Sequence, residues 1–197
     1  MHVIRSVVFW LGLLAVTLVG GCATHPADGP KRGTEREIAD LAAQIEALGP
    51  EVDPEEAARA ARIAYAHTHR LALEYEITDP PLVHNTKVNL GLKPRGLCWH
   101  WAEDMETRLK EEEFRTLRLH RAIANADNPF RIDHSTAIIS SRGAGMFDGI
   151  VLDPWRKGGV LFWAPTRSDT DYNWRPQHEV LSQKRERARS RALLFAE

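Results

Sequence analysis

Residues 96–113, GLCWHWAEDMETRLKEEE, contain the pattern around which the rest of the chain can be interpreted. Their apolar side chains recur at the spacing of one helical face, which predicts an amphipathic helix that begins at Cys98. The apolar stripe of this helix comprises Cys98, Trp101, Ala102, Met105 and Leu109. The opposite side carries Glu103, Glu106, Lys110 and Glu113. The thiol therefore begins the buried face, beside the free N–H groups of the first helical turn.

This position suits a reactive thiol. The free N–H groups and the helix dipole favour the thiolate over the thiol, and the N–H of Cys98 is placed to help bind an oxyanion. A thiol nucleophile also needs a base within hydrogen-bond reach, and that base needs a group that orients its second ring nitrogen. Taken alone, Cys98 also fits a small buried hydrophobic residue, the commoner state of a free cysteine.

Four short segments after this helix have the alternating or β-branched pattern of strands. They are residues 114–123 (FRTLRLHRAI), 133–141 (DHSTAIISS), 149–155 (GIVLDPW) and 158–165 (GGVLFWAP). Asn, Gly or Pro residues separate them, as expected for short antiparallel connections. Because helices come first and an antiparallel sheet follows, the chain is expected to belong to the α+β class rather than to the alternating βαβ class.

A hairpin between the second and third of these strands supplies the missing base and its partner. If residues 142–149 close the hairpin with Ala137 opposite Ile150, His134 lies directly across from Asp153 on the same face of the sheet. A slip of one residue would place the two side chains on opposite faces. Each of them also has a structural interpretation, His134 as a core histidine and Asp153 as part of a strand end.

The beginning of the chain predicts export. Arg5 precedes the apolar segment VVFWLGLLAVTLVGG, which is short for a membrane span and ends in small residues, so residues 1–21 are interpreted as a signal peptide. The closing LVGGC resembles the lipobox of bacterial lipoproteins, which implies cleavage before Cys22 and acylation of that cysteine. Ala23 then implies the outer membrane. The alternative is an uncleaved anchor with an ordinary cysteine.

Only two cysteines are present, so a lipidated Cys22 leaves Cys98 without a disulfide partner in the chain. Residues 22–34 are rich in Pro, Gly and charge and predict a flexible tether. Residues 35–197 are expected to form one domain, with a helical part at 35–81 and a catalytic core at 82–175.

Two helices are predicted before this core. The first spans Thr34 to Leu48, and the second begins at Asp53, with Glu56 placed to complete a capping box. Residues 82–97 are expected to form an irregular approach to the Cys98 helix. The basic segment that follows Pro176 (QHEVLSQKRERARSRALLFAE) is expected to form a closing helix.

Composition and spacing argue against two classes of partner. The 26 Lys and Arg residues nearly balance the 27 Asp and Glu residues, so no nucleic-acid partner is predicted. His67 and His69 lie two apart on a predicted helix, as do Cys98 and His100, so each pair points to nearly opposite sides. No pair has a zinc spacing, and neither a metal nor another cofactor is predicted.

A cysteine at a helix start, a histidine on a strand and Asp-Pro at the end of the next strand resemble the transglutaminase-like branch of the papain-like cysteine enzymes. The resemblance covers roughly residues 82–165. It implies that Cys98 is the nucleophile, His134 the general base and acid, and Asp153 the orienting carboxylate. Asn85 and Asn89 are candidates for a side-chain oxyanion donor.

The resemblance implies a transglutaminase-like α+β domain with about four strands, acting through a thioester on an amide bond. Together with the lipobox it implies a membrane-anchored thiol hydrolase, a peptidase or amidase, on the periplasmic face of the outer membrane. The expected partners are the membrane, through Cys22, and a periplasmic protein or peptidoglycan peptide as substrate. The alternative is a non-catalytic envelope lipoprotein that uses the same fold as a scaffold or binding module.

Overall fold

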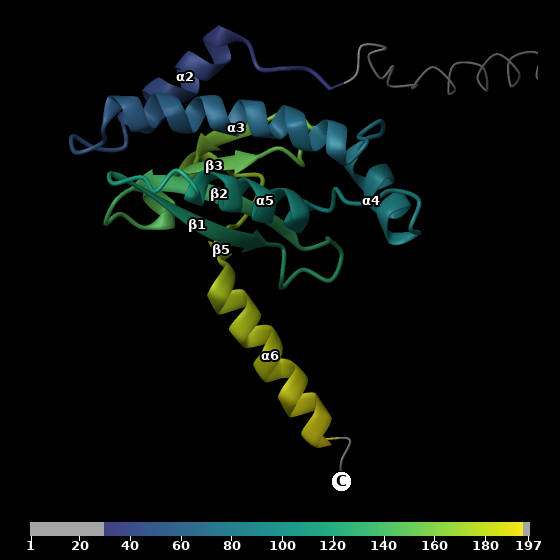
Figure 1. Cartoon of the computed structure of the whole chain (residues 1–197). Coiled ribbons are helices and arrows are strands. Elements are labelled where there is room, and N and C mark those ends of the chain that lie inside the picture. The colour runs from purple at the N-terminus through teal and green to yellow at the C-terminus, as the bar shows by residue number, and fades with distance from the viewer. Residues whose placement is uncertain (1–29, 195–197) are drawn as a thin grey trace, which may run out of the picture.

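The computed structural model describes residues 30–194, which form an α+β fold (Figure 1). The helices are α2 (Glu35–Glu46), α3 (Pro54–Glu74), α4 (Pro81–Asn89), α5 (Cys98–Lys110) and α6 (Gln177–Leu194), with short 3-10 turns η1 (Met146–Asp148) and η2 (Thr166–Ser168). The strands are β1 (Leu117–Ala124), β2 (His134–Ser141), β3 (Ile150–Asp153), β4 (Phe162–Pro165) and β5 (Arg175–Pro176). The predicted signal peptide, Cys22 and most of the tether lie outside the described residues, so lipidation stays a prediction.

All five strands form one antiparallel sheet in the order β4-β3-β2-β1-β5. The expected count of about four strands misses β5, a strand of two residues that pairs with Ala122 and Ile123 of β1. A segment this short carries no periodicity that a sequence pattern can reveal.

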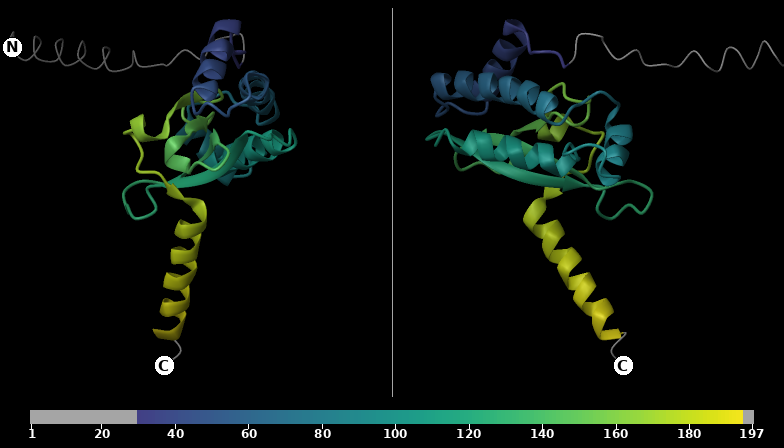
Figure 2. Two further views of the ribbon diagram at one scale, coloured as in Figure 1. Left: turned by 90° about the vertical axis from the view of Figure 1, so that its left-hand side faces the viewer. Right: turned by 45° about the vertical axis from the view of Figure 1, so that its right-hand side comes forward.

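Helices α2, α3 and α5 cover one face of the sheet (Figures 1 and 2). Side chains that alternate along β2 separate the two faces. Ala137 and Ile139 pack under the helices with Met105 and Leu109 of α5. Ile138 points to the opposite face, where a smaller apolar cluster includes Ala122, Ala124, Met146, Val151 and Trp174.

The predicted apolar stripe of α5 is confirmed, because Cys98, Trp101, Ala102, Met105 and Leu109 are all buried. The irregular approach predicted for residues 82–97 is wrong in its first half, which forms α4. Pro81 stands at the start of that helix, where its fixed φ favours helix and its missing N–H costs nothing. The Pro80-Pro81 pair therefore starts a helix, whereas α3 ends earlier, at Glu74.

The hairpin between β2 and β3 forms, but its register differs from the predicted one by two residues. Ala137 pairs with Leu152, and Ile139 pairs with Ile150. Continuing this ladder by one residue sets Thr136, not His134, opposite Asp153. A shift of two residues keeps every side chain on its face, so His134 and Asp153 remain diagonal neighbours on one side of the sheet.

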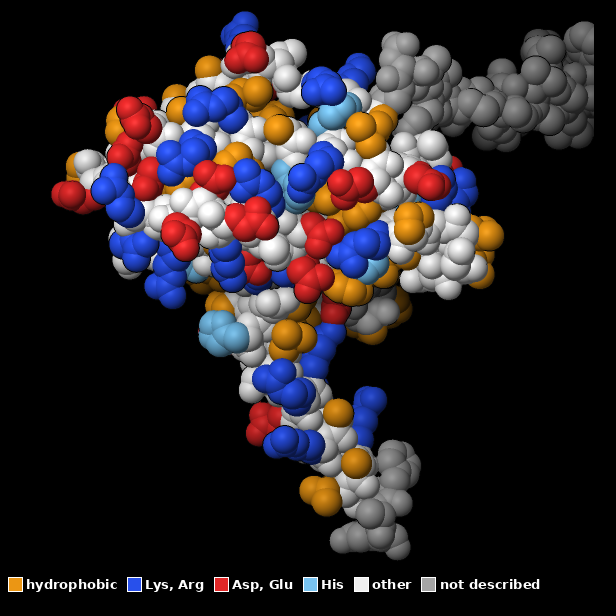
Figure 3. Space-filling view, viewed as in Figure 1, with side chains coloured by type: hydrophobic (Ala, Val, Ile, Leu, Met, Phe, Trp, Pro, Cys, Tyr) orange, Lys and Arg blue, Asp and Glu red, His pale blue; other side chains and the backbone are white. Residues whose placement is uncertain are grey.

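Helix α6 projects from the body of the molecule (Figures 1 and 2). Figure 3 shows acidic and basic side chains interspersed over the body and mostly basic ones along α6. The basic residues of this helix are Lys184, Arg185, Arg187, Arg189 and Arg191. None of the helices within residues 30–194 has the length and apolar character needed to cross a membrane.

The N-terminus of α3 contains a buried carboxylate with a structural role. Asp53 caps the helix, as predicted, by accepting from the N–H groups of Glu55 and Glu56. The Glu56 side chain does not complete a capping box. It is 4 % exposed and accepts from the Arg115 N–H at 2.8 Å and the Thr116 N–H at 2.9 Å, in the loop before β1. This carboxylate therefore joins α3 to the sheet.

We expect Glu56→Ala to lower the free energy of unfolding by about 2 to 3 kcal/mol, because two backbone donors lose a charged acceptor in a buried setting. Urea unfolding measures the change. Glu55→Ala is the matched control, since Glu55 is exposed in the same helical turn, and its effect should stay within about 0.5 kcal/mol. Equal losses in the two variants would contradict this role of Glu56.

Candidate active site

Cys98 is the first residue of α5 and is 7 % exposed. Its thiol donates to the carbonyl of Asp133 at 3.5 Å, immediately before β2. The nucleophile candidate therefore lies where α5 begins and β2 starts. The first intrahelical hydrogen bond is donated by His100 to the Leu97 carbonyl at 2.9 Å, so the N–H groups of Cys98 and Trp99 precede the helical ladder.

The segment before Cys98 is held by side chains of α5 itself. His100 Nδ1 accepts from the N–H groups of Gly96 at 3.1 Å and Leu97 at 3.2 Å. The Trp101 indole donates to the Gly96 carbonyl at 3.0 Å. Burial, assisted by the charge of Arg95, lowers the pKa of His100 to about 4, so its ring is neutral near pH 7 and its Nδ1 can accept. These bonds set the position at which the chain enters α5.

A second set of contacts holds the same segment from outside. Arg95 donates to both carboxylate oxygens of Asp104, at 2.9 and 3.0 Å, and Tyr75 of α3 donates to the same carboxylate. Burial and this carboxylate raise the pKa of Tyr75. His84 of α4 contacts the Arg95 carbonyl through Nε2 at 2.9 Å. Helices α3, α4 and α5 therefore all position the approach to Cys98.

The structure brings His134 and Asp153 together, since His134 Nε2 lies 2.6 Å from Asp153 Oδ2 and both residues are 1 % exposed. Asp153 has further donors in Arg156, whose backbone N–H lies 3.1 Å from Oδ1 and whose Nε lies 3.0 Å from Oδ2. The other Arg156 nitrogens donate to Asp169 at 2.9 and 2.7 Å. The imidazole is thus held by a carboxylate that is itself fixed in place.

The electrostatic surroundings favour a protonated His134. Burial opposes the charged ring, but the charge and hydrogen bond of Asp153 outweigh burial, and Cys98 acts in the same direction. Together they raise the pKa of His134 to about 9. Near neutral pH the ring is therefore an imidazolium.

Three aromatic rings surround this imidazole. The centroids of Trp155, Tyr172 and Trp174 lie 4.7, 4.5 and 5.3 Å from that of His134. The Trp155 indole donates to the amide oxygen of Asn85 at 3.0 Å. This oxyanion candidate therefore supports an aromatic neighbour of His134.

Asn89, the second candidate, is exposed at the end of α4. Neither asparagine lines the hollow at Cys98. The N–H groups at the start of α5 are thus the oxyanion donors that the geometry offers.

Cys98 and His134 approach each other from different sides of the sheet. By alternation His134 shares the face of Ile138, whereas α5 covers the face of Ala137. Helix α5 begins at the end of the sheet where β2 starts, so the thiol of Cys98 lies against the carbonyl of Asp133, one residue before His134. His134 Nε2 is engaged by Asp153, and Nδ1 has no hydrogen-bond partner within the part of the chain that the structure describes. Nδ1 is therefore the nitrogen left for exchange of a proton with the thiol.

The thiol opens onto a hollow of about 540 Å³ on the helical side of the sheet. Its walls come from α5, β1, the start of β2 and the start of α6, and include Cys98, Trp99, Glu103, Arg121, Ser135 and Leu181. His134 and Asp153 are not among the lining residues. The thiol is therefore reached from this hollow, whereas the ion pair of His134 and Asp153 stays enclosed behind it.

Sequence reasoning missed most of the residues that support the candidate triad. Arg156 lies in the turn between the third and fourth predicted strands, and Asp169, Tyr172 and Trp174 follow the fourth. The only indication of their role in the sequence is that they are charged or aromatic residues in loops, where functional side chains concentrate. The spacing of His100 from Cys98 argues only against a zinc site and does not indicate that His100 binds the segment before α5. Across residues 30–194, no cluster of three or more His, Cys, Asp or Glu side chains is arranged to hold a metal ion.

Comparisons of this chain with protein-family models, with curated proteins and with solved structures return no match.

The His134 pKa can be measured directly. We expect NMR titration of labelled histidine to place the pKa near 9 and Asp153→Asn to lower it clearly, because the main contribution that opposes burial is then removed. Since the folded-state pKa is raised, its contribution to stability is complete below about pH 6.5 and is lost as pH rises through about 9. The loss amounts to at most about 3 kcal/mol. A His134 that titrates near 6.5 in the wild type would contradict the coupling.

Gly96 is required by the segment before Cys98. Its φ is +123°, and a Cβ there would lie 2.3 Å from His84 Nε2. We expect Gly96→Ala to lower the free energy of unfolding by about 2 to 3 kcal/mol and to slow alkylation of Cys98. Gly91→Ala is the control, with φ of +72° and none of the described atoms within 4 Å of its Cβ, and should cost about 1 kcal/mol. Equal effects would show that packing at Gly96 is unimportant.

Proposed function

We propose that the protein is a membrane-anchored thiol hydrolase, a peptidase or amidase of the transglutaminase-like group of papain-like enzymes. Cys98, His134 and Asp153 would carry the reaction. The observation that supports this best is a thiol at a helix start beside a buried imidazole whose Nε2 is held by a carboxylate at 2.6 Å. Nucleophile, proton carrier and orienting group then occur in the arrangement that thiol catalysis needs.

The resting state in this proposal is a thiolate of Cys98 paired with the imidazolium of His134. The thiolate attacks the carbonyl carbon of the substrate amide, and the N–H groups of Cys98 and Trp99 bind the developing oxyanion. His134 then gives its proton to the amide nitrogen, and the C–N bond breaks. The amine departs, and the acyl group remains on Cys98 as a thioester.

Hydrolysis of the thioester reverses the role of His134. The neutral ring takes a proton from a water molecule, whose oxygen attacks the thioester carbonyl. The C–S bond then breaks, the carboxylic acid leaves, and the thiolate of Cys98 and the imidazolium of His134 are restored. Asp153 and Arg156 stay in place throughout. The imidazole ring of His134 therefore keeps its orientation both when it loses its proton and when it regains it.

Anchoring follows from the lipobox-like sequence before Cys22. Acylation there would hold the domain on the periplasmic face of the outer membrane, since several acyl chains anchor a protein stably where one does not. The substrates within reach are periplasmic proteins and the peptides of peptidoglycan. The competing hypothesis is an envelope lipoprotein that uses this fold only as a scaffold or binding module.

Alkylation by iodoacetamide tests the activated thiol. We expect Cys98 to react at pH 6.5 about tenfold faster in the wild type than in His134→Gln, because the imidazolium stabilises the thiolate. Mass spectrometry of the peptide that contains Cys98 measures the rate. His69→Gln, which changes a histidine of α3 away from the site, should leave the rate unchanged.

The reaction itself is tested by adding the purified wild type and Cys98→Ala to cell-envelope preparations. Hydrolysis releases fragments whose new ends together gain one water, and only the wild type should release them. An alkylation rate equal to that of His134→Gln, with no fragments specific to the wild type, would support the non-catalytic lipoprotein instead.

A further inference from the structure

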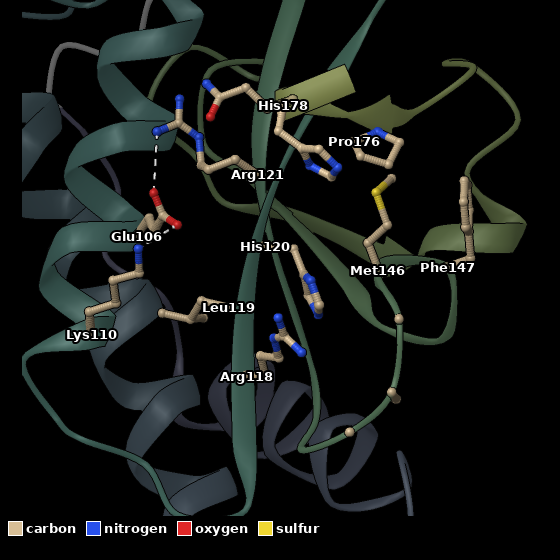
Figure 4. Close-up of a pocket in the computed structure, with 14 residues that line it drawn as sticks. Glu106, Lys110, Arg118, Leu119, His120, Arg121, Met146, Phe147, Pro176 and His178 are labelled. Carbon is tan, nitrogen blue, oxygen red and sulfur yellow. Dashed lines mark hydrogen bonds and ion pairs between the residues drawn. The ribbon is translucent and has the colours of Figure 1, made fainter. Parts of the chain in front are cut away.

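A second hollow of about 730 Å³ lies across the outer edge of β1 (Figure 4). Lys110 of α5 lines it on one side of the strand, and Arg118, His120 and Phe147 line it on the other. It shares Glu106, Arg121 and Gln177 with the hollow that contains Cys98. The two hollows therefore adjoin at these three residues, and the second hollow is the groove along β1.

The edge of β1 is open along most of this groove. Strand β5 pairs with β1 only at Ala122 and Ile123. Within the described chain, no strand pairs with residues 117–121 on the side away from β2. An open edge of this kind presents backbone donors and acceptors that an extended peptide can satisfy.

The ladder between β1 and β2 determines which backbone groups are free. The Arg142 N–H donates to the Thr116 carbonyl at 2.7 Å, so Thr116 directs its backbone toward β2. Both backbone groups of a residue in an antiparallel strand point the same way, and successive residues alternate. Arg118 and His120 therefore bond to β2, whereas Leu117, Leu119 and Arg121 present N–H and C=O to the groove.

The charge of the groove indicates what it binds. The second hollow is lined by three cations, Lys110, Arg118 and Arg121, and by one carboxylate, Glu106, whereas the hollow of Cys98 adds Glu103 and Asp133. Glu106 is already paired with Lys110 at 2.9 Å and Arg121 at 3.5 Å. Arg118 has no ion pair with any described residue. Because Arg118 and Arg121 are three residues apart in a strand, they lie on opposite faces, so acidic side chains on either face of an added strand meet a cation.

We propose that an extended, acidic peptide segment of the substrate adds to β1 as an edge strand at Leu117–Arg121 and continues into the hollow of Cys98. Strand β5 occupies the edge from Ala122 onward, so a chain that follows β1 has to leave the edge near Arg121, where the two hollows adjoin. This names the substrate class of the proposed hydrolase and rests on that function for the reaction, although not for binding.

Binding is tested in the full-length Cys98→Ala protein with a fluorescein-labelled, end-blocked hexapeptide of alternating Glu and Val. We expect binding that Arg118→Glu weakens about tenfold or more, because a cation in the groove becomes an anion. Arg185→Glu makes the same charge change on exposed α6, outside the groove, and should leave the Kd unchanged. A peptide with Lys in place of Glu should not bind. Equal effects of the two arginine variants would overturn the proposal.

Strand addition also predicts which amides change. Hydrogen exchange followed by NMR should show slower exchange at Leu119 and Arg121 when the peptide binds, and no change at Arg118 and His120, which already bond to β2. Methylation of alternate peptide nitrogens should abolish binding. Binding without slower exchange at Leu119 and Arg121 would overturn strand addition.

The outcome separates this proposal from the hydrolase function. If the peptide binds as expected but Cys98 is unreactive, peptide binding along β1 is supported and the hydrolase function is contradicted. If Cys98 is reactive but the peptide does not bind, the hydrolase function is supported and peptide binding along β1 is contradicted. Protection of Leu119 and Arg121 without peptide, together with a dimer in sedimentation, would assign the edge to a second copy of this chain and overturn the proposal.

Discussion

Burial of the His134–Asp153 pair is the constraint on which the candidate site depends. Charged groups that leave water need partners, and both side chains here are 1 % exposed. Arg156 supplies donors to Asp153 and requires Asp169 in turn, and the Trp174 indole donates to Asp169 at 2.9 Å. The segment after β4 is thus held in place by Asp169 and Trp174, which are linked through Arg156 to the buried pair of Asp153 and His134.

A second network of hydrogen bonds fixes the position of the Cys98 thiol. His100, Trp101 and Arg95 fix the segment before Cys98 through bonds to its backbone and to Asp104. The two networks come from different parts of the chain and meet only at the end of the sheet. Cys98 lines an open hollow, and His134 stays enclosed behind it. A buried ion pair therefore lies next to a thiol that can be reached from outside.

The sequence predicted the α+β class, the α5 stripe and the pairing of β2 with β3, because these depend on local periodicity. The sequence also predicted that His134 and Asp153 lie on one face of the sheet, but it did so from a strand pairing that differs from the observed one. The predicted register was wrong by two residues, and the pair survives because side chains alternate with a period of two. It did not reveal α4, the two-residue β5 or the buried role of Glu56, since each depends on contacts with distant segments.

What the sequence determined by itself is therefore the order of the elements and which side chains share a face. It also placed the unusual cysteine at a helix start. Tertiary structure alone decided that α5 begins at the end of the sheet, that Arg156 and Asp169 support the imidazole, and that β5 leaves most of the β1 edge open. Periodicity is encoded in neighbouring residues, whereas these features arise from packing between segments far apart in the chain, which spacing along the sequence does not record.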